Sequence, residues 1–271
     1  YSMSICIFAS ELAIITGHNK YQNLNEYILK LWKKTFPSDY QEHLDLYSNK
    51  NNVEIVQQTP EEKLLELSKK HNVNINECLN AKDTKTLQTT QNSIINKIQE
   101  KDPKIDLTEL KKCVQQVTNT NFGTKNEKNS LNQYNTKTQK NIATTNKFFK
   151  KEIFTTKKYK WLIGGKIDGL DEDEDTIIEF KNRVNRLFYK LRDYERVQTM
   201  TYMFLLEKNN SRLVETLKNR GDTQMNVIEV AWDSDFWETE IIEKLKSFSK
   251  EFEKLMNSTK KKLEFLEETL E

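Results

Sequence analysis

The sequence is poor in the residues that build zinc sites, disulfide frameworks and thiol-based catalytic centres. Its 271 residues include only three cysteines, Cys6, Cys78 and Cys113, which are odd in number and widely separated. Its three histidines share no cluster. This scarcity argues against a zinc site and against a Ser-His or Cys-His nucleophile. It also makes a reducing, intracellular compartment the default expectation.

The sequence also lacks a membrane-spanning run and an excess of either charge. The apolar stretch 5–15 is too short to span a membrane and contains Glu11, so we expect a core helix there rather than a signal peptide. Basic and acidic residues number 43 and 41, a formal net charge of +2, so a globally basic nucleic-acid binder is not indicated. The length and the 36% of hydrophobic residues suffice for one large α/β domain or two small ones.

Charge is nevertheless unevenly distributed along the chain. Acidic residues gather at 168–179, and basic residues gather just upstream, at Lys137, Lys140, Lys147, Lys150, Lys151, Lys157, Lys158 and Lys160. A basic track that leads to an acidic cluster suits a polyanion that is held by lysines and cut at a metal. Lysines on the outer face of solvated strands explain any single one of these positions equally well.

Hydrophobic periodicity predicts an α/β fold with a mixed central β-sheet flanked by helices. The expected helices are a short one capped by Ser10, then 24–34, 122–138, 193–206 and a long one from Asp235. The expected strands are 147–155, 159–167, 175–181 and 224–232.

Residues 38–120 are polar and are predicted to form a helical insertion, with helices at 61–71 and 106–118 and no core signal at 81–90. We therefore expect a single domain over 1–271. Within it we place this insertion, a catalytic core over 121–232 and a C-terminal helix over 233–271.

Asp168, Glu179 and Lys181 are the strongest candidates for chemistry. They lie in the stretch GGKIDGLDEDEDTIIEFKNR, which is typical of two strands joined by an acidic turn. Alternation along the second strand places Glu179 and Lys181 on one face, and a hairpin would bring Asp168 to Glu179. Two carboxylates and an ammonium then converge, as metal-assisted phosphodiester hydrolysis requires. On these residues alone, a solvated acidic turn beside a chance E-x-K is the alternative.

Four local motifs surround this centre. They are ASE with GHNKY at 9–21, G-x-x-x-E ending at Glu127 with Tyr134 beyond it, GKIDG with EFK at 165–181, and YERVQ with YM at 194–203. In this order the chain resembles the PD-(D/E)xK nuclease superfamily and, more narrowly, its phage lambda exonuclease and YqaJ viral recombinase branch. The resemblance implies a restriction-endonuclease-like core.

The resemblance also implies roles for residues of the centre. Asp168 and Glu179 would ligate one or two Mg²⁺ ions, for which Mn²⁺ can substitute, with the Phe180 carbonyl as a further ligand. Glu127 would reach the same metal directly or through water, its alternative being a helix-surface acid.

Two further residues would support the chemistry without binding the metal. Lys181 would orient the attacking water and stabilise developing charge. Gln198 would hydrogen-bond a metal-site carboxylate or the water, its alternative being an amide that caps the sheet edge.

DNA-phosphate contacts are expected from Ser10 at its helix start, from Lys20 and from Arg183. A plain N-cap is the alternative for Ser10. Arg186, like Arg183, could grip the DNA backbone, and pairing with the acidic turn is the alternative for both. The family usually carries a W-x-x-x-R segment upstream of the serine, whereas eight residues, none basic, precede Ala9 here. Either the sequence is truncated or that phosphate contact is made elsewhere.

The sequence therefore predicts a Mg²⁺-dependent DNA nuclease, in the first place a 5′–3′ exonuclease that resects linear double-stranded DNA for recombination or repair. A structure-specific or restriction-type endonuclease and a catalytically silent DNA-binding protein of the same fold are the alternatives. The expected partners are double-stranded DNA ends and a single-strand annealing recombinase, with a homo-oligomer as a further option and no membrane. A viral or phage origin, with action inside the infected cell, completes the expectation.

Overall fold

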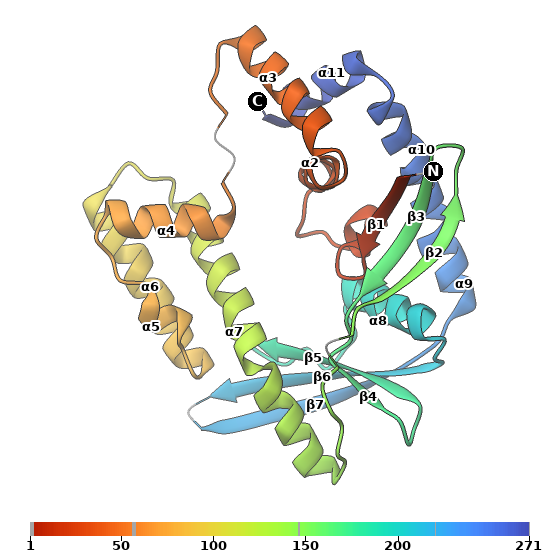
Figure 1. Ribbon diagram of the computed structural model, residues 1–271. Coiled ribbons are helices and arrows are strands. Elements are labelled where there is room, and N and C mark those ends of the chain that lie inside the picture. The colour runs from red at the N-terminus through yellow and green to blue at the C-terminus, as the bar shows by residue number, and fades with distance from the viewer. Residues whose placement is uncertain (1–2, 56–57, 146, 220, 271) are drawn as a thin grey trace.

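The computed structural model describes residues 3–55, 58–145, 147–219 and 221–270. The fold contains two small sheets, and in the view of Figure 1 the sheet of β1, β2 and β3 lies above the sheet of β4 to β7. Helices from both ends of the chain cover the first sheet (Figure 1). A long helix crosses the second sheet and continues into a helical arm (Figure 1). Within the described ranges, no helix is both long and apolar enough to cross a membrane.

The first sheet has the strand order β1-β3-β2. Strand β3 (Tyr159–Gly165) pairs in parallel with β1 (Met3–Phe8) and antiparallel with β2 (Phe149–Thr155). The core helix predicted over 5–15 is therefore wrong in its first half. Ile5 and Ile7 alternate with more exposed neighbours and are almost fully buried, which is the two-residue period of a strand.

The second sheet has the order β4-β5-β6-β7 and contains the predicted E-x-K strand. Strand β5 (Thr176–Arg183) pairs antiparallel with β4 (Gly169–Asp171) and in parallel with β6 (Asn210–Asn219), which in turn pairs antiparallel with β7 (Asp222–Ala231). Both sheets mix strand directions, so the predicted mixed α/β architecture is confirmed. Two points differ from expectation: the strands form two sheets, and the hairpin partner of β5 is the short β4, not β3.

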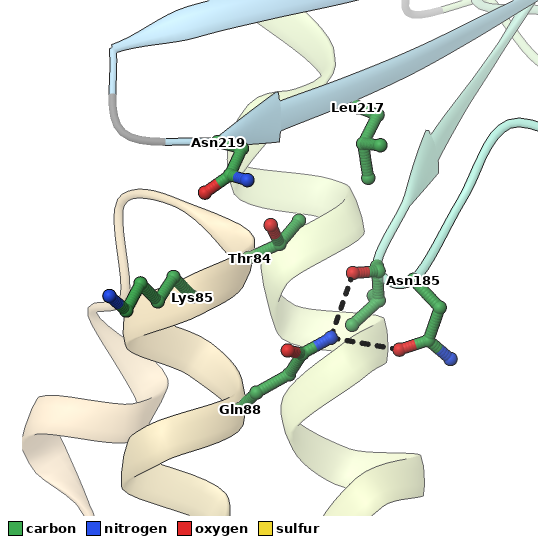
Figure 2. Close-up of a pocket in the computed structure, with 7 residues that line it drawn as sticks. Thr84, Lys85, Gln88, Asn185, Leu217 and Asn219 are labelled. Carbon is green, nitrogen blue, oxygen red and sulfur yellow. Dashed lines mark hydrogen bonds between the residues drawn. The ribbon is translucent and has the colours of Figure 1, made fainter.

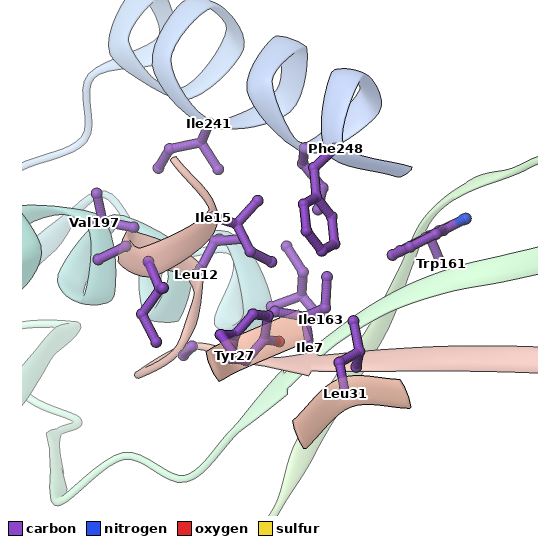
Figure 3. Close-up of a cluster of buried hydrophobic side chains, with 14 of the residues drawn as sticks. Ile7, Leu12, Ile15, Tyr27, Leu31, Trp161, Ile163, Val197, Ile241 and Phe248 are labelled. Atoms are coloured by element: carbon purple, nitrogen blue, oxygen red, sulfur yellow. The ribbon is translucent and has the colours of Figure 1, made fainter. Parts of the chain in front are cut away.

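The main hydrophobic core lies between the first sheet and the terminal helices (Figure 3). Ile7 and Ile163 from the sheet meet Leu31, Val197 and Phe248 from three helices there. The helices that supply this layer are α1 (Leu12–Ile15), α2 (Leu24–Thr35), α3 (Pro37–Asn51), α8 (Asp193–Leu206), α9 (Ser234–Phe236), the π-helical turn η1 (Trp237–Ile242), α10 (Glu243–Met256) and α11 (Thr259–Leu270).

Two predictions about this layer need correction. The C-terminal segment is not one helix, because the chain breaks at Asn257 between α10 and α11. Helix α3 does not belong to a separate insertion, because it packs on the main core through Tyr40 and Leu44.

The helical arm has a hydrophobic core of its own, made by α4 (Pro60–Lys70), α5 (Asn76–Leu79), α6 (Thr84–Lys101) and the first half of α7 (Leu107–Thr138). The stretch 81–90, for which the sequence shows no core signal, enters α6 and buries Leu87 completely. The helices predicted at 106–118 and 122–138 are one continuous helix of 32 residues.

Helix α7 joins the arm to the second sheet. Its Phe122 lies in the arm core, whereas its Leu131 and Tyr134 pack with Phe180 of β5. Gln88 of α6 makes a second connection, donating from Nε2 to the Val184 carbonyl (3.2 Å) and to Asn185 Oδ1 (2.9 Å) (Figure 2). A polar cavity of about 360 Å³ lies beside this contact. The arm is thus attached to the end of the strand that carries Glu179 and Lys181.

Candidate active site

Asp168 and Glu179 come together because β4 pairs with β5. The register opposes Gly169 to Ile178, so Asp168, one residue earlier, lies beside Glu179 and Phe180. The Phe180 amide donates to Asp168 Oδ2 at 2.8 Å and fixes that carboxylate. Burial raises the pKa of Asp168 above its usual range.

Glu179 is the most unusual carboxyl of the centre, because it is only 4% exposed. Its Oε1 accepts from Lys181 Nζ (2.8 Å) and from Gln198 Nε2 (3.0 Å), whereas its Oε2 is buried without a hydrogen-bond donor. Burial and the neighbouring charge of Asp168 raise the pKa of Glu179 to about 8. A carboxylate oxygen in this situation needs either a proton or a cation.

Lys181 is held between two side chains. Its Nζ donates to Glu179 Oε1 and to Gln198 Oε1, the latter at 2.9 Å. Burial lowers the pKa of Lys181, but the charge of Glu179 and the hydrogen bond to it outweigh burial and keep that pKa above its ordinary value. Lys181 is therefore charged at neutral pH and cannot turn away without losing both partners.

Gln198 links this group to helix α8. Besides its bonds to Lys181 and Glu179, its Nε2 donates to the hydroxyl of Tyr202 at 2.9 Å. Tyr202 is buried and lies one helical turn beyond Gln198, on the same face. A Cβ added at Gly165 would come within 2.8 Å of the Tyr202 ring, so a glycine here makes room for it.

Glu127 is the one predicted acid of the site that does not join Asp168 and Glu179. It projects from α7 and is exposed, although partial burial and the charge of Asp168 raise its pKa. Across the described ranges, no three side chains among His, Cys, Asp and Glu stand close enough together to hold a metal ion. Asp168 and Glu179 therefore lie together as a pair, and Glu127 interacts with the charge of Asp168 without forming a three-carboxylate cluster with them.

Comparison with known proteins places this centre in a family. The family model described as the PD-(D/E)XK nuclease superfamily matches residues 65–270, which include every residue of the centre. The chain belongs to the PD-(D/E)XK nuclease superfamily. Its predicted resemblance to that superfamily is confirmed, and its activity class is that of a nuclease. Nucleases of this superfamily generally use divalent metals.

Solved structures similar to this chain include two exonucleases. The alkaline exonuclease LHK-Exo from Laribacter hongkongensis shares 18% identity over 68% of this chain and 89% of its own, with a TM-score of 0.39. A phage-related exonuclease from Haemophilus somnus 129PT shares 9% identity over 95% of this chain and 96% of its own, with a TM-score of 0.43. Both similarities are too distant to carry an argument about mechanism. No curated protein matches the chain.

Within this nuclease fold, Arg183 is not a DNA-phosphate ligand, and the prediction that it is must be corrected. It is only 8% exposed, and its guanidinium donates to Glu195 Oε1 at 2.7 Å and lies 2.7 Å from Glu215 Oε1. Both acceptors are fully buried. The alternative pairing of Arg183 with the acidic turn is equally wrong, because that turn binds other cations, namely Lys140, Lys208 and Arg212.

Ser10 also differs from its predicted role. Helix α1 is only four residues long, its N-cap is Glu11, and no side chain caps it. Ser10 is exposed in the turn before it. A helix this short has no developed N-terminal anion site, so the predicted phosphate contact loses its basis. Lys20 is exposed in the turn before α2, and its predicted role stays a prediction.

Sequence reasoning missed Tyr202 and Asn182 as members of the site. Asn182 follows Lys181 and donates from Nδ2 to the Gly123 carbonyl of α7 at 2.9 Å, which ties the helix of Glu127 to β5. The i, i+4 spacing from Gln198 is a sequence signal that could have identified Tyr202. No local signal identifies Asn182, because its partners lie on other elements of the fold.

Proposed function

We propose that the chain is a divalent-metal-dependent deoxyribonuclease and, more specifically, a 5′–3′ exonuclease acting on ends of linear double-stranded DNA in recombination or repair. One observation carries the proposal. The half-buried carboxylate of Asp168 and the buried carboxylate of Glu179 lie side by side, Glu179 Oε2 has no donor, and a charged Lys181 lies 2.8 Å from Glu179.

The residues present fit a divalent cation. Carboxylate oxygens are hard donors that suit Mg²⁺ or Mn²⁺, and a cation would satisfy Glu179 Oε2 and relieve the repulsion between the two acids. We assign Asp168 and Glu179 as the direct ligands, with the Phe180 carbonyl as a further ligand and Glu127 acting through water. The bound cation would supply a Lewis acid that lowers the pKa of water and offsets charge on the phosphodiester.

The protein's own contribution lies in Lys181 and the residues that hold it. Its ammonium would orient the attacking water and stabilise the negative charge that develops on the phosphate in the transition state. Gln198 forms hydrogen bonds with both Lys181 and Glu179, so it keeps the Lys181 ammonium and the Glu179 carboxylate in a fixed relative orientation. Tyr202 in turn holds the Gln198 amide. This chain of hydrogen bonds leaves Lys181 little freedom to leave the site.

A duplex labelled at one end tests the proposal. The protein should release label from linear duplex when Mg²⁺ is present and not in excess chelator. Label at the 5′ end should be released early as mononucleotides, and label at the 3′ end late. A covalently closed circle should remain intact. Glu179→Gln should be inactive in this assay. Glu172→Gln, which changes an exposed acid of the turn, is its matched control and should cleave like the parent.

The outcomes separate the proposals. Full activity in chelator would contradict metal dependence, and cleavage of the closed circle would replace the exonuclease with an endonuclease. Absence of cleavage on every DNA substrate would leave the DNA-binding alternative of the same fold. A recombinase partner, self-assembly and a viral or phage origin stay predictions.

A further inference from the structure

The segment 184–192, which joins β5 to α8, is a compact basic and aromatic loop. It contains Arg186, Lys190 and Arg192 and no acidic residue. It leaves β5 three residues after Lys181 and enters α8 six residues before Gln198. Strand β5, with Glu179 and Lys181, and helix α8, with Gln198, are therefore both continuous with this loop, which we call the basic-aromatic loop.

Tyr189 of this loop has an exposed aromatic ring and a strained backbone conformation. Tyr189 is 68% exposed and has a φ of 56°, a left-handed conformation that costs a bulky residue free energy. The buried Glu215 carboxylate imposes it, accepting from the amides of Phe188 (3.1 Å) and Tyr189 (2.9 Å). These hydrogen bonds hold the backbone in its strained conformation and leave the Tyr189 side chain exposed to water.

Cations surround the neighbouring ring, that of Phe188. The guanidinium groups of Arg186 and Arg192 lie 5.9 Å and 4.5 Å from the centroid of Phe188. Among the described residues, no carboxylate lies within ion-pair distance of Arg186, Lys190 or Arg192. These charges are therefore available to an external anion.

A second exposed tyrosine extends the surface from another part of the chain. Tyr21 is 71% exposed, its hydroxyl accepts from Arg192 at 2.8 Å, and its ring meets that of Tyr194 edge to face at 6.2 Å. Tyr194 lies on α8, one turn before Gln198. The surface thus runs from the loop to the edge of the active site.

We propose that the basic-aromatic loop and Tyr21 bind an unpaired DNA strand beside the active site. Exposed rings interleaved with arginines match a single strand, whose bases are free to stack while its phosphates meet the cations. A duplex offers its phosphates but hides the faces of its bases, so it would use the arginines alone. The inference rests on the proposed function in taking DNA as the substrate.

Binding without cleavage tests the proposal. A fluorescein-labelled 20-nucleotide single strand of mixed sequence would be titrated with the protein in chelator, and its anisotropy recorded. Tyr189→Asn is the informative variant, because asparagine adopts positive φ readily and removes the ring. We expect roughly tenfold weaker binding, since one stacked base contributes on that scale, together with a Tm no lower than that of the parent. Tyr189→Phe keeps the ring and should bind like the parent.

The role of the arginines is tested by the salt dependence of single-strand binding. Arg186→Gln should lower the slope of log affinity against log salt concentration by about 0.7, the value for one phosphate contact on a single strand. Lys104→Gln, an exposed charge in the turn between α6 and α7 of the arm, is the matched control and should leave the slope unchanged.

Each outcome has a definite meaning. Parent-like binding by Tyr189→Asn, or no binding of the single strand by the parent, would overturn the proposed surface. Either result could stand beside Mg²⁺-dependent cleavage of duplex by the parent, which would leave the nuclease proposal intact. Conversely, weakened binding by Tyr189→Asn in a protein that cleaves nothing would support the surface and contradict the nuclease proposal.

Discussion

Glu179→Gln should make the metal-free protein more stable and at the same time inactive. In the folded protein the pKa of Glu179 is raised to about 8, whereas in the unfolded chain the carboxyl ionises near its ordinary value of 4.5. Below pH 4.5 it is protonated in both states. As pH rises towards 8, the folded state retains a proton that the unfolded state releases, so the stability that the protonated form contributes is progressively lost.

The size of the effect follows from the interval between the two pKa values. At pH 7 the medium lies about 2.5 units above 4.5, and each unit corresponds to 1.36 kcal/mol, so the loss is on the order of 3 kcal/mol. Glutamine has the same shape and cannot ionise. Its oxygen can accept from Lys181 and Gln198, and its amide can donate towards Asp168, which removes the buried oxygen that lacks a donor.

Urea unfolding followed by circular dichroism, in chelator and at steps from pH 4.5 to 8, measures the difference directly. Parent and Glu179→Gln should agree near pH 4.5 and diverge as pH rises, with the variant more stable. Glu172→Gln, on the exposed turn, should follow the parent throughout. Added Mg²⁺ should stabilise the parent and not Glu179→Gln. Parallel stability curves for parent and Glu179→Gln would refute the reasoning, because they would show that Glu179 titrates as it does in the unfolded chain.

Three other substitutions test neighbouring parts of the site. Lys181→Ala should keep the metal-induced rise in Tm but lower the rate of duplex cleavage by roughly a hundredfold or more, as loss of a group that acts on transition-state charge does; a parent-like rate would exclude the assigned role. Glu127→Gln should shift the Mg²⁺ titration of activity to higher concentration, and an unchanged titration would return Glu127 to the helix surface. Arg183→Met should lower the free energy of unfolding by about 3 to 5 kcal/mol, because it leaves two buried carboxylates without their cation; unfolding in urea measures this, and a loss below about 1 kcal/mol would mean that Glu195 and Glu215 find other partners.

The sequence by itself determined the parts of the fold that depend on neighbours along the chain. The alternation of Ile178 and Phe180 with Glu179 and Lys181 predicted the E-x-K strand, and the helical stripe through Val197 and Leu205 predicted the bounds of α8. Strand β6 escaped notice because it lies between β5 and β7 and its centre is buried on both faces, so it shows no alternation. The stretch 5–15 was predicted wrongly because a strand and a short helix follow each other there, separated only by Ala9, Ser10 and Glu11.

The site divides in the same way. Asp168, Glu179 and Lys181 were recognisable because their chemistry and spacing are local, and a short antiparallel pairing is enough to bring them together. The role of Arg183 was not recognisable. Its partner Glu215 lies on β6, more than thirty residues away, and only the parallel pairing of β5 with β6 places that carboxylate beneath the guanidinium.

The tertiary structure alone therefore decided which charges face the solvent. Arg183 and Arg186 are three residues apart and alike in sequence, yet one is buried between two carboxylates and the other is exposed beside Phe188. The reason is physical: a buried guanidinium needs anions that surround it in three dimensions, and the sequence of one strand does not contain them. Local pattern fixed which groups could do chemistry here, and packing between distant segments fixed which of them are free to meet a substrate.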